Sequence, residues 1–259
     1  WQRSLQKTGS KGSCVTRELP MQRRMRLFRN RCLVLVPGPV PVTVGPGGLA
    51  PGLALAGLFI EVSVRLGLPV APAAVVGLVG GTASLVVHEL GHAFAARTVT
   101  GVRPVGVSLI WLGAVTRLEG AYTRGLDQAK VAAAGPAISF ALALALAPFL
   151  FVPAPFGLRG ALVMLAALNA GIGAVNLLPA NPLDGYRALV GLLWFARGSE
   201  QAARRLIRRL AFTWAPFEVI GSGFLLVQRP FLGSLAVIMA LGLIGQRVFV
   251  ARARSEARA

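Results

Sequence analysis

Six long apolar segments with almost no charged residues constrain this chain more than any other feature of its sequence. Glu61 and Arg65 interrupt the first segment, but they are four residues apart and can pair on one helix face. Each segment approaches the roughly 20 residues that an α-helix needs to cross a bilayer. The sequence therefore predicts an α-helical polytopic membrane protein with about six transmembrane helices. The segments are residues 48–68, 71–96, 131–151, 160–178, 211–228 and 231–250.

The composition excludes an ordinary soluble enzyme. Hydrophobic residues make up 55% of the chain and charged residues 14%, whereas soluble domains have about 45–50% and about 25%. The net charge of +18 would suggest a nucleic-acid partner in a soluble protein. No basic polar face is visible, however, so we expect no nucleic acid. The two cysteines, Cys14 and Cys32, are too few for a cysteine zinc site.

The positions of the basic residues predict how the chain crosses the membrane. Of the 27 basic residues, 24 fall in four segments that lie on one side if the six helices alternate. Only Arg65, Arg159 and Arg229 fall on the other side. Basic residues concentrate in cytoplasmic segments. We therefore expect a multi-pass protein of the cell membrane with both termini cytoplasmic. The cytoplasmic segments would be residues 1–47, 97–130, 179–210 and 251–259, with Arg247 at the end of the last helix.

The basic segment 1–31 is polar and without pattern, which predicts a disordered N-terminal tail. The chain begins at Trp1, and Met21 or Met25 would be a more natural start. Residues 32–259 form the second predicted domain, with a core at about 70–200. Of its connecting segments, residues 36–52 contain five prolines and predict an interfacial loop, not a regular helix.

Two other connecting segments have recognisable patterns. Residues 102–122 alternate with a period of two, which predicts a small membrane-associated β-hairpin or sheet with a turn at Gly113. Residues 186–196 are too few to cross a bilayer and predict an interfacial or re-entrant helix.

The only two histidines of the chain lie together in the motif His88-Glu89-Leu90-Gly91-His92. Positions i and i+4 share a helix face, so both imidazoles can reach one metal ion. Glu89 lies beside that ion and can take a proton from its bound water. Two buried structural histidines are the plainer alternative, but ionisable groups are costly within a membrane helix and are usually functional.

A catalytic zinc ion needs a third protein ligand, and the chain has only two aspartates. Asp127 lies in a charged segment between Arg124 and Lys130, where a solvated position is expected. Asp184 directly follows an apolar span, after two prolines that end the helix and before Gly185, which permits a tight turn. Both motifs lie toward the cytoplasmic side in the predicted topology, which favours Asp184 as the third ligand.

These motifs resemble the site-2 protease family of intramembrane zinc metalloproteases. The resemblance covers residues 50–200 and rests on His88-Glu-Leu-Gly-His92 and on Asn176-Leu-Leu-Pro followed by Pro182-Leu-Asp-Gly. The segment Ala134-Gly135-Pro136 also resembles the second core helix of the family. The resemblance implies that His88, His92 and Asp184 bind one Zn²⁺, that Glu89 is the general base, and that Asn176 holds the substrate or the oxyanion.

The six predicted spans resemble the prokaryotic branch of that family, with some departures. We expect no regulatory domain after Arg254 and no inserted PDZ domain, and Tyr186 stands where many relatives have a second glycine. The resemblance implies regulated intramembrane proteolysis, with a single-span helix or signal-peptide remnant as the protein partner and the bilayer around it. An extended substrate would pair with residues 102–122.

Two other functions compete with proteolysis. One is a proteolytically inactive zinc-binding scaffold that holds client helices, which would not need the base Glu89. The other is a metal transporter, which would need acidic or histidine groups along several spans. Glu218 is the only other acidic residue deep within a span, so the sequence favours the protease.

Overall fold

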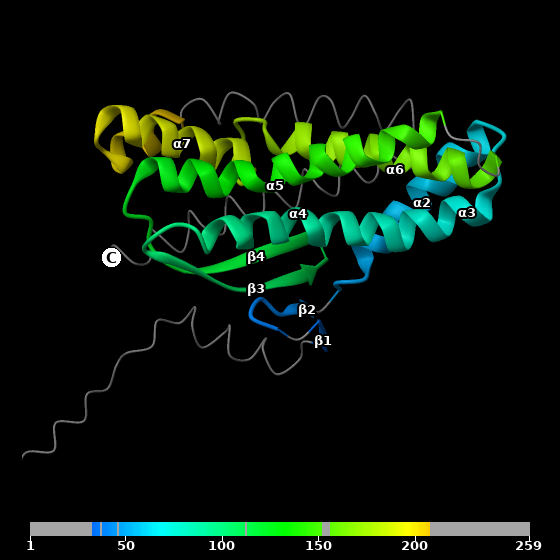
Figure 1. Ribbon diagram of the computed structural model, residues 1–259, viewed down its shortest axis with the longest axis horizontal. Helices are drawn as coiled ribbons and strands as arrows, with labels where there is room; N and C mark the ends of the chain where they lie inside the picture. Colours follow the sequence, from blue (N-terminus) through cyan, green and yellow to red (C-terminus); the bar gives the residue numbers. More distant parts are fainter. Residues whose placement is uncertain (1–32, 37, 46, 112, 152–155, 208–259) are drawn as a thin grey trace, which may run out of the picture. The chain divides into compact units, whose positions relative to one another are not determined.

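The computed structural model describes residues 33–207 apart from residues 37, 46, 112 and 152–155. Six of its helical segments carry the label α, and two short ones carry η (Figure 1). The N-terminal tail, the spans at 211–228 and 231–250, and Glu218 lie outside the described residues. The helical segments are α2 Ala50–Arg65, α3 Val70–Val75, η1 Val76–Gly80, α4 Gly81–Ala96, α5 Gly125–Leu146, η2 Ala147–Leu150, α6 Phe156–Asn176 and α7 Asp184–Arg197.

Three helices of the described part are long and apolar enough to cross a membrane, namely Val70–Ala96, Gly125–Leu150 and Gly157–Asn176. They correspond to the predicted spans 71–96, 131–151 and 160–178. The first predicted span, 48–68, forms a helix of only 16 residues, α2, and is shorter than a full membrane crossing. Glu61 pairs with Arg65 in the last turn of α2, as their spacing predicted.

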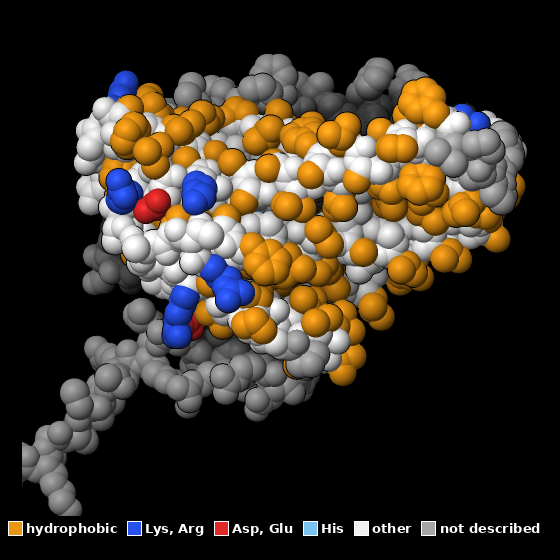
Figure 2. All heavy atoms as spheres, in the orientation of Figure 1, with side chains coloured by type: hydrophobic (Ala, Val, Ile, Leu, Met, Phe, Trp, Pro, Cys, Tyr) orange, Lys and Arg blue, Asp and Glu red, His pale blue; other side chains and the backbone are white. Residues whose placement is uncertain are grey.

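The surface of the helices is strongly apolar, as expected for contact with lipid. Leu144 of α5 and Val79 of η1 are 75% and 63% exposed. Figure 2 shows hydrophobic side chains over most of the visible helical surface, with charged side chains gathered mainly at the end where α7 lies and over the hairpin. Large exposed apolar surfaces mark contact with a membrane or another protein.

Helix α5 begins at Gly125, six residues before the predicted span. Residues 125–130 are therefore helical, and Asp127 lies in the first turn, where the positive end of the helix dipole favours an acidic residue. Pro136 lies inside α5 without ending it. Membrane helices tolerate proline because neighbouring groups satisfy the freed backbone carbonyl.

The described strands form one four-stranded sheet in the order β1-β2-β3-β4. The strands β3 (Val102–Ile110) and β4 (Gly113–Gly120) form the predicted hairpin. The prediction of a loop over residues 36–52 was wrong in part. β1 (Leu33–Val36) and β2 (Val42–Val44) join the sheet, with β2 parallel to β3. Valine favours strands, and the prolines of this segment lie outside the three or four residues of each strand.

The sheet packs against α4 through a small apolar core of Val40, Val42, Ala93 and Val107. Helix α5 contacts α4, α6 and α7, so it lies at the centre of the described helices (Figure 1). Helix α7 confirms the helix predicted at 186–196, and its 14 residues span about 21 Å, too little to cross the bilayer. Its buried Val190 packs with Ala203 and Ile207.

Candidate metal centre and active site

The structure brings His88, His92 and Asp184 together although Asp184 is more than 90 residues away in the sequence. The Nε2 atoms of His88 and His92 each lie 3.1 Å from Oδ2 of Asp184. All three side chains are buried, and their ligand atoms lie within 4.8 Å of one another. In the part of the chain that the structure describes, this is the one group of three His, Cys, Asp or Glu side chains placed to hold a metal ion. Asp127 is not in it.

The Nδ1 atoms of both imidazoles, on the side of the ring away from Asp184, are hydrogen-bonded to α5. His92 Nδ1 lies 2.7 Å from the carbonyl oxygen of Val131, and because a carbonyl can only accept, Nδ1 carries the proton. His88 Nδ1 lies 2.8 Å from Oγ of Ser139. Hydrogen bonds of this kind orient metal-ligating histidines and fix which nitrogen binds the metal. Both Nε2 atoms are therefore directed to the same point as the Asp184 carboxylate.

Asp184 is the first residue of α7, where the helix dipole favours a negative charge. Gly185 brings it close to the preceding loop, because a Cβ atom there would lie 2.1 Å from the Leu177 carbonyl oxygen. Gly185 was predicted to permit a tight turn. In the structure it lies in α7, and its lack of a side chain permits close backbone packing instead. Burial alone would raise the pKa of Asp184, but the hydrogen bonds with His88 and His92 lower it to about 2. The ligand is therefore a carboxylate at neutral pH.

The residues fit a zinc ion. Two imidazole nitrogens and one carboxylate oxygen are a known catalytic zinc ligand set that leaves one coordination position open. Ligands at about 2.0–2.1 Å in tetrahedral geometry are about 3.3 Å apart, close to the two distances of 3.1 Å found here. The site is therefore nearly preformed for zinc.

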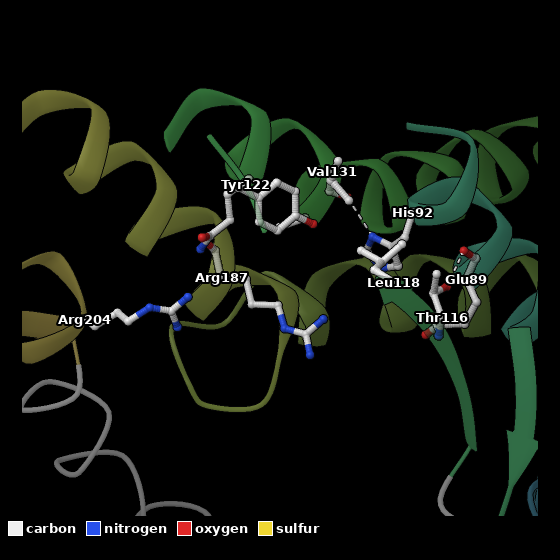
Figure 3. A pocket seen from close by; sticks show the side chains of 10 residues that line it. Glu89, His92, Thr116, Leu118, Tyr122, Val131, Arg187 and Arg204 are labelled. Carbon is white, nitrogen blue, oxygen red and sulfur yellow. Dashed lines mark hydrogen bonds between the residues drawn. The ribbon is translucent and has the colours of Figure 1, made fainter. Parts of the chain in front are cut away.

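Glu89, the predicted base, is hydrogen-bonded to the hairpin. Its Oε2 accepts a hydrogen bond of 2.7 Å from the backbone N–H of Thr116 in β4. The Thr116 hydroxyl in turn donates to the Glu89 carbonyl oxygen at 2.6 Å. Glu89 and His92 both line a cavity of about 290 Å³ between α4, α5, α7 and β4 (Figure 3). A carboxylate that lines the same cavity as a candidate metal ligand is placed to meet a molecule bound there.

Asn176 lies at the C-terminal end of α6 and is not among the residues that line this cavity. Its Nδ2 donates to the Ile172 carbonyl oxygen of the same helix at 2.9 Å. A role toward the substrate would require this amide to turn away from its own helix.

The sequence reasoning did not identify Ser139, Val131 or Thr116. Ser139 lies four residues after Gly135 on α5, and the helix period alone could have placed them on one face. The carbonyl of Val131 and the amide of Thr116 are backbone groups, which no side-chain pattern identifies.

Gly135 packs directly against the two histidines, and replacing it with alanine should abolish zinc binding. A Cβ atom there would lie 2.3 Å from Nε2 of His92 and 2.7 Å from Nε2 of His88. Alanine is otherwise the better helix former by about 1 kcal/mol. Gly171→Ala in α6 is the matched control, because a Cβ atom there meets nothing within 4 Å. Zinc content and thermal melting of both variants check this prediction, and a zinc-loaded Gly135→Ala protein would contradict it.

Comparisons with known proteins agree with this fold and site. Residues 76–163 match the family model described as Peptidase family M50. The chain is 37% identical over 127 residues to Rip3 of Mycobacterium tuberculosis, a protein named as a zinc metalloprotease. It is 30% identical over 151 residues to the zinc metalloprotease MJ0392 of Methanocaldococcus jannaschii. These alignments cover 47% and 56% of this chain. They cover only 32% and 43% of the relatives, so the chain matches less than half of their length.

The structure is similar to the solved site-2 protease from Methanocaldococcus jannaschii, with a TM-score of 0.55 at 20% identity. The similarity covers 82% of this chain and 94% of the other. Fold and site together thus define a helical membrane protein with a zinc centre of two histidines and one aspartate. The resemblance to the site-2 protease family that the motifs predicted is confirmed, because residues 76–163 match Peptidase family M50 and the fold is similar to that of the solved site-2 protease.

Proposed function

We propose that this chain is an intramembrane zinc metalloprotease that hydrolyses peptide bonds in or near transmembrane segments of other membrane proteins. One observation carries the proposal. His88 and His92, which flank Glu89 on a helix apolar enough to cross the membrane, meet Asp184 from a different helix. A binding scaffold would need no carboxylate base next to the ligands. The family and its named zinc metalloproteases support the same reaction class.

The roles proposed for the residues follow from their chemistry. A zinc ion held by His88, His92 and Asp184 supplies Lewis acidity for activating water and polarising the scissile carbonyl. Glu89 accepts the proton of the attacking water and returns it to the leaving amine. The Asn176 amide, once turned from Ile172, would donate a hydrogen bond to the developing oxyanion. The buried site keeps bulk water away from the reacting groups.

A transmembrane substrate hides its carbonyl groups in its own helix, so it must be extended before cleavage. Strand β4 offers an edge for that extended segment. Val107 donates its backbone N–H to Pro41, away from β4, although it lies opposite Thr116. In an antiparallel pair of strands, the backbone N–H and C=O groups of two opposed residues either both point toward the other strand or both point away from it. Thr116 therefore directs its backbone groups to the edge of β4 that lies away from β3, where its N–H binds Glu89, and an extended substrate added along this edge would lie beside Glu89.

The proposed topology has both termini in the cytoplasm and predicts the signals of reporter fusions. Fusions after Arg124, Arg205 and Arg254 should report the cytoplasm, and a fusion near Ala154 should report the outside. The reason is the distribution of 24 basic residues on one side and three on the other. An alkaline phosphatase and green fluorescent protein pair measures both locations in cells. An outside signal at Arg124 would place the metal centre toward the opposite face and contradict the topology.

A further inference from the structure

The cavity beside the metal centre has a second wall that the proposed mechanism does not use. Besides Glu89 and His92, the cavity is lined by Tyr122, Gln128, Arg187 and Arg204. In Figure 3 the two arginine side chains extend from the α7 side, and that of Arg187 is directed toward the His92 side of the cavity. Glu89 is the one acidic residue that lines the cavity, and Thr116 already binds its carboxylate.

Gln128 contributes a buried side chain to this wall. The side chain is 4% exposed, and its Nε2 donates to the Arg187 carbonyl oxygen at 2.9 Å. Because that carbonyl can only accept, the bond fixes which end of the amide is the nitrogen. The opposite end, Oε1, is buried without a partner in the described part of the chain. Buried polar atoms are normally satisfied by a protein group, a ligand or an ordered water, so a hydrogen-bond donor is expected here.

The two arginines supply positively charged hydrogen-bond donors to the same cavity. Arg204 pairs with Glu200, whereas the guanidinium of Arg187 has no acceptor among the described residues. Burial raises the pKa of the Tyr122 phenol, although the Arg187 charge opposes this effect, so the phenol stays a neutral donor. Arginines near a membrane surface often serve only the topology. That role would not explain the buried, unpartnered amide oxygen of Gln128, a residue that lines the same cavity.

The size of the cavity limits what can enter it. One turn of an α-helix with side chains, about 10 Å wide and 5.4 Å long, encloses roughly 400 Å³. The cavity has about 290 Å³. It has room for an extended peptide with one or two side chains. Such a peptide carries the N–H donor that Gln128 lacks, and an acidic side chain would supply the acceptor for the arginine.

We propose that Arg187, with Arg204, Tyr122 and Gln128, forms a subsite that recognises an acidic side chain of the extended substrate near the scissile bond. The Arg187 guanidinium binds the carboxylate, and Gln128 Oε1 accepts a backbone N–H of the same segment. This subsite rests on the proposed proteolytic function and names the substrates that the enzyme selects, namely membrane segments with Asp or Glu close to the cleavage site.

The test measures binding, so it does not depend on hydrolysis. Zinc-loaded Glu89→Gln protein in zwitterionic detergent is titrated with labelled single-span peptides in which one Glu, or one Gln, is moved through the residues flanking the scissile bond. At one position the Glu peptide should bind at least about tenfold more tightly than its Gln partner. Adding Arg187→Gln should reduce this ratio to within about twofold, and Arg187→Lys should keep part of it.

Arg197→Gln is the matched control, because Arg197 lies on the same helix, is exposed and does not line the cavity. It should keep the full ratio. Zinc content and melting temperature establish that each variant is folded. Equal binding of the Glu and Gln peptides at every position, or an equal loss in Arg197→Gln, would overturn the subsite. It would also be overturned if Arg187→Gln weakened only the binding of added phosphatidylglycerol. Absence of cleavage by the wild type would instead contradict the proposed function.

Discussion

Replacing Glu89 with glutamine should leave the zinc ion bound and lower peptide hydrolysis by at least about 10²–10⁴-fold. Glutamine keeps the size of the side chain, and its amide oxygen can still accept the hydrogen bond from Thr116. His88, His92 and Asp184 are unchanged, so the metal centre should persist. What is lost is the group that accepts a proton from water. Cleavage of a single-span peptide in liposomes, with zinc content measured on the same sample, checks this expectation.

The control for this variant is Glu119→Gln in β4, which makes the same chemical change on an exposed side chain paired with Arg103. Exposed ion pairs contribute little to stability, so activity should be unchanged. Unaltered cleavage by zinc-loaded Glu89→Gln protein would remove Glu89 from the mechanism. A wild type that binds zinc and client helices but cleaves none of a broad panel of membrane segments would favour the scaffold instead.

The sequence predicted the parts of the site that depend on local spacing or on residue scarcity. His88 and His92 are the only histidines, and a separation of four places them on one helix face. Asp184 could be selected over Asp127 because the two prolines before it end a span at the same side of the membrane. The structure brings Asp184 to both imidazoles, although only the order of the spans connected these positions in the sequence.

The contacts that hold the site together could not be predicted in this way. The carbonyl of Val131 and the amide of Thr116 are present at every position of a chain, so no residue type identifies them. Gly135 is needed because a side chain there would collide with two histidine nitrogens, and this close contact becomes visible only when α4 and α5 are packed together. The pairing of β2 with β3 joins residues about 65 positions apart, and three-residue strands carry too short a pattern to be recognised.

Helix α4 connects these parts physically. It carries two of the three candidate metal ligands and the proposed base, it packs on the sheet through Ala93, and α5 binds its imidazoles through Val131 and Ser139. The free edge of β4 is bonded to the same helix at Glu89. A segment that binds to this edge would therefore lie beside Glu89, so the proposed function gives the small sheet a role in placing the substrate as well as in stabilising the fold.

Removing the third ligand should strip zinc from the protein. The wild type should carry about one zinc ion per chain, and Asp184→Asn replaces an anionic ligand with a neutral amide of the same shape. Loss of a group that merely orients a ligand weakens metal binding by about 10–100-fold. Loss of a ligand itself should weaken it more, because two imidazoles alone leave the ion half coordinated. Elemental analysis and competition with a chromophoric chelator measure the zinc content and the affinity.

Asp127→Asn is the matched control for this experiment, because these are the only two aspartates of the chain. Asp127 lies in the first turn of α5, outside the group of ligand atoms, so its variant should keep the full zinc content. Loss of zinc from Asp127→Asn together with full retention in Asp184→Asn would show that the third ligand is wrongly assigned. Loss from both, with lowered melting temperatures in both, would show instead that each carboxylate is needed for folding, and Asp184→Glu would then decide. It keeps the charge, so a folded Asp184→Glu protein that binds zinc weakly would place the ligand at position 184.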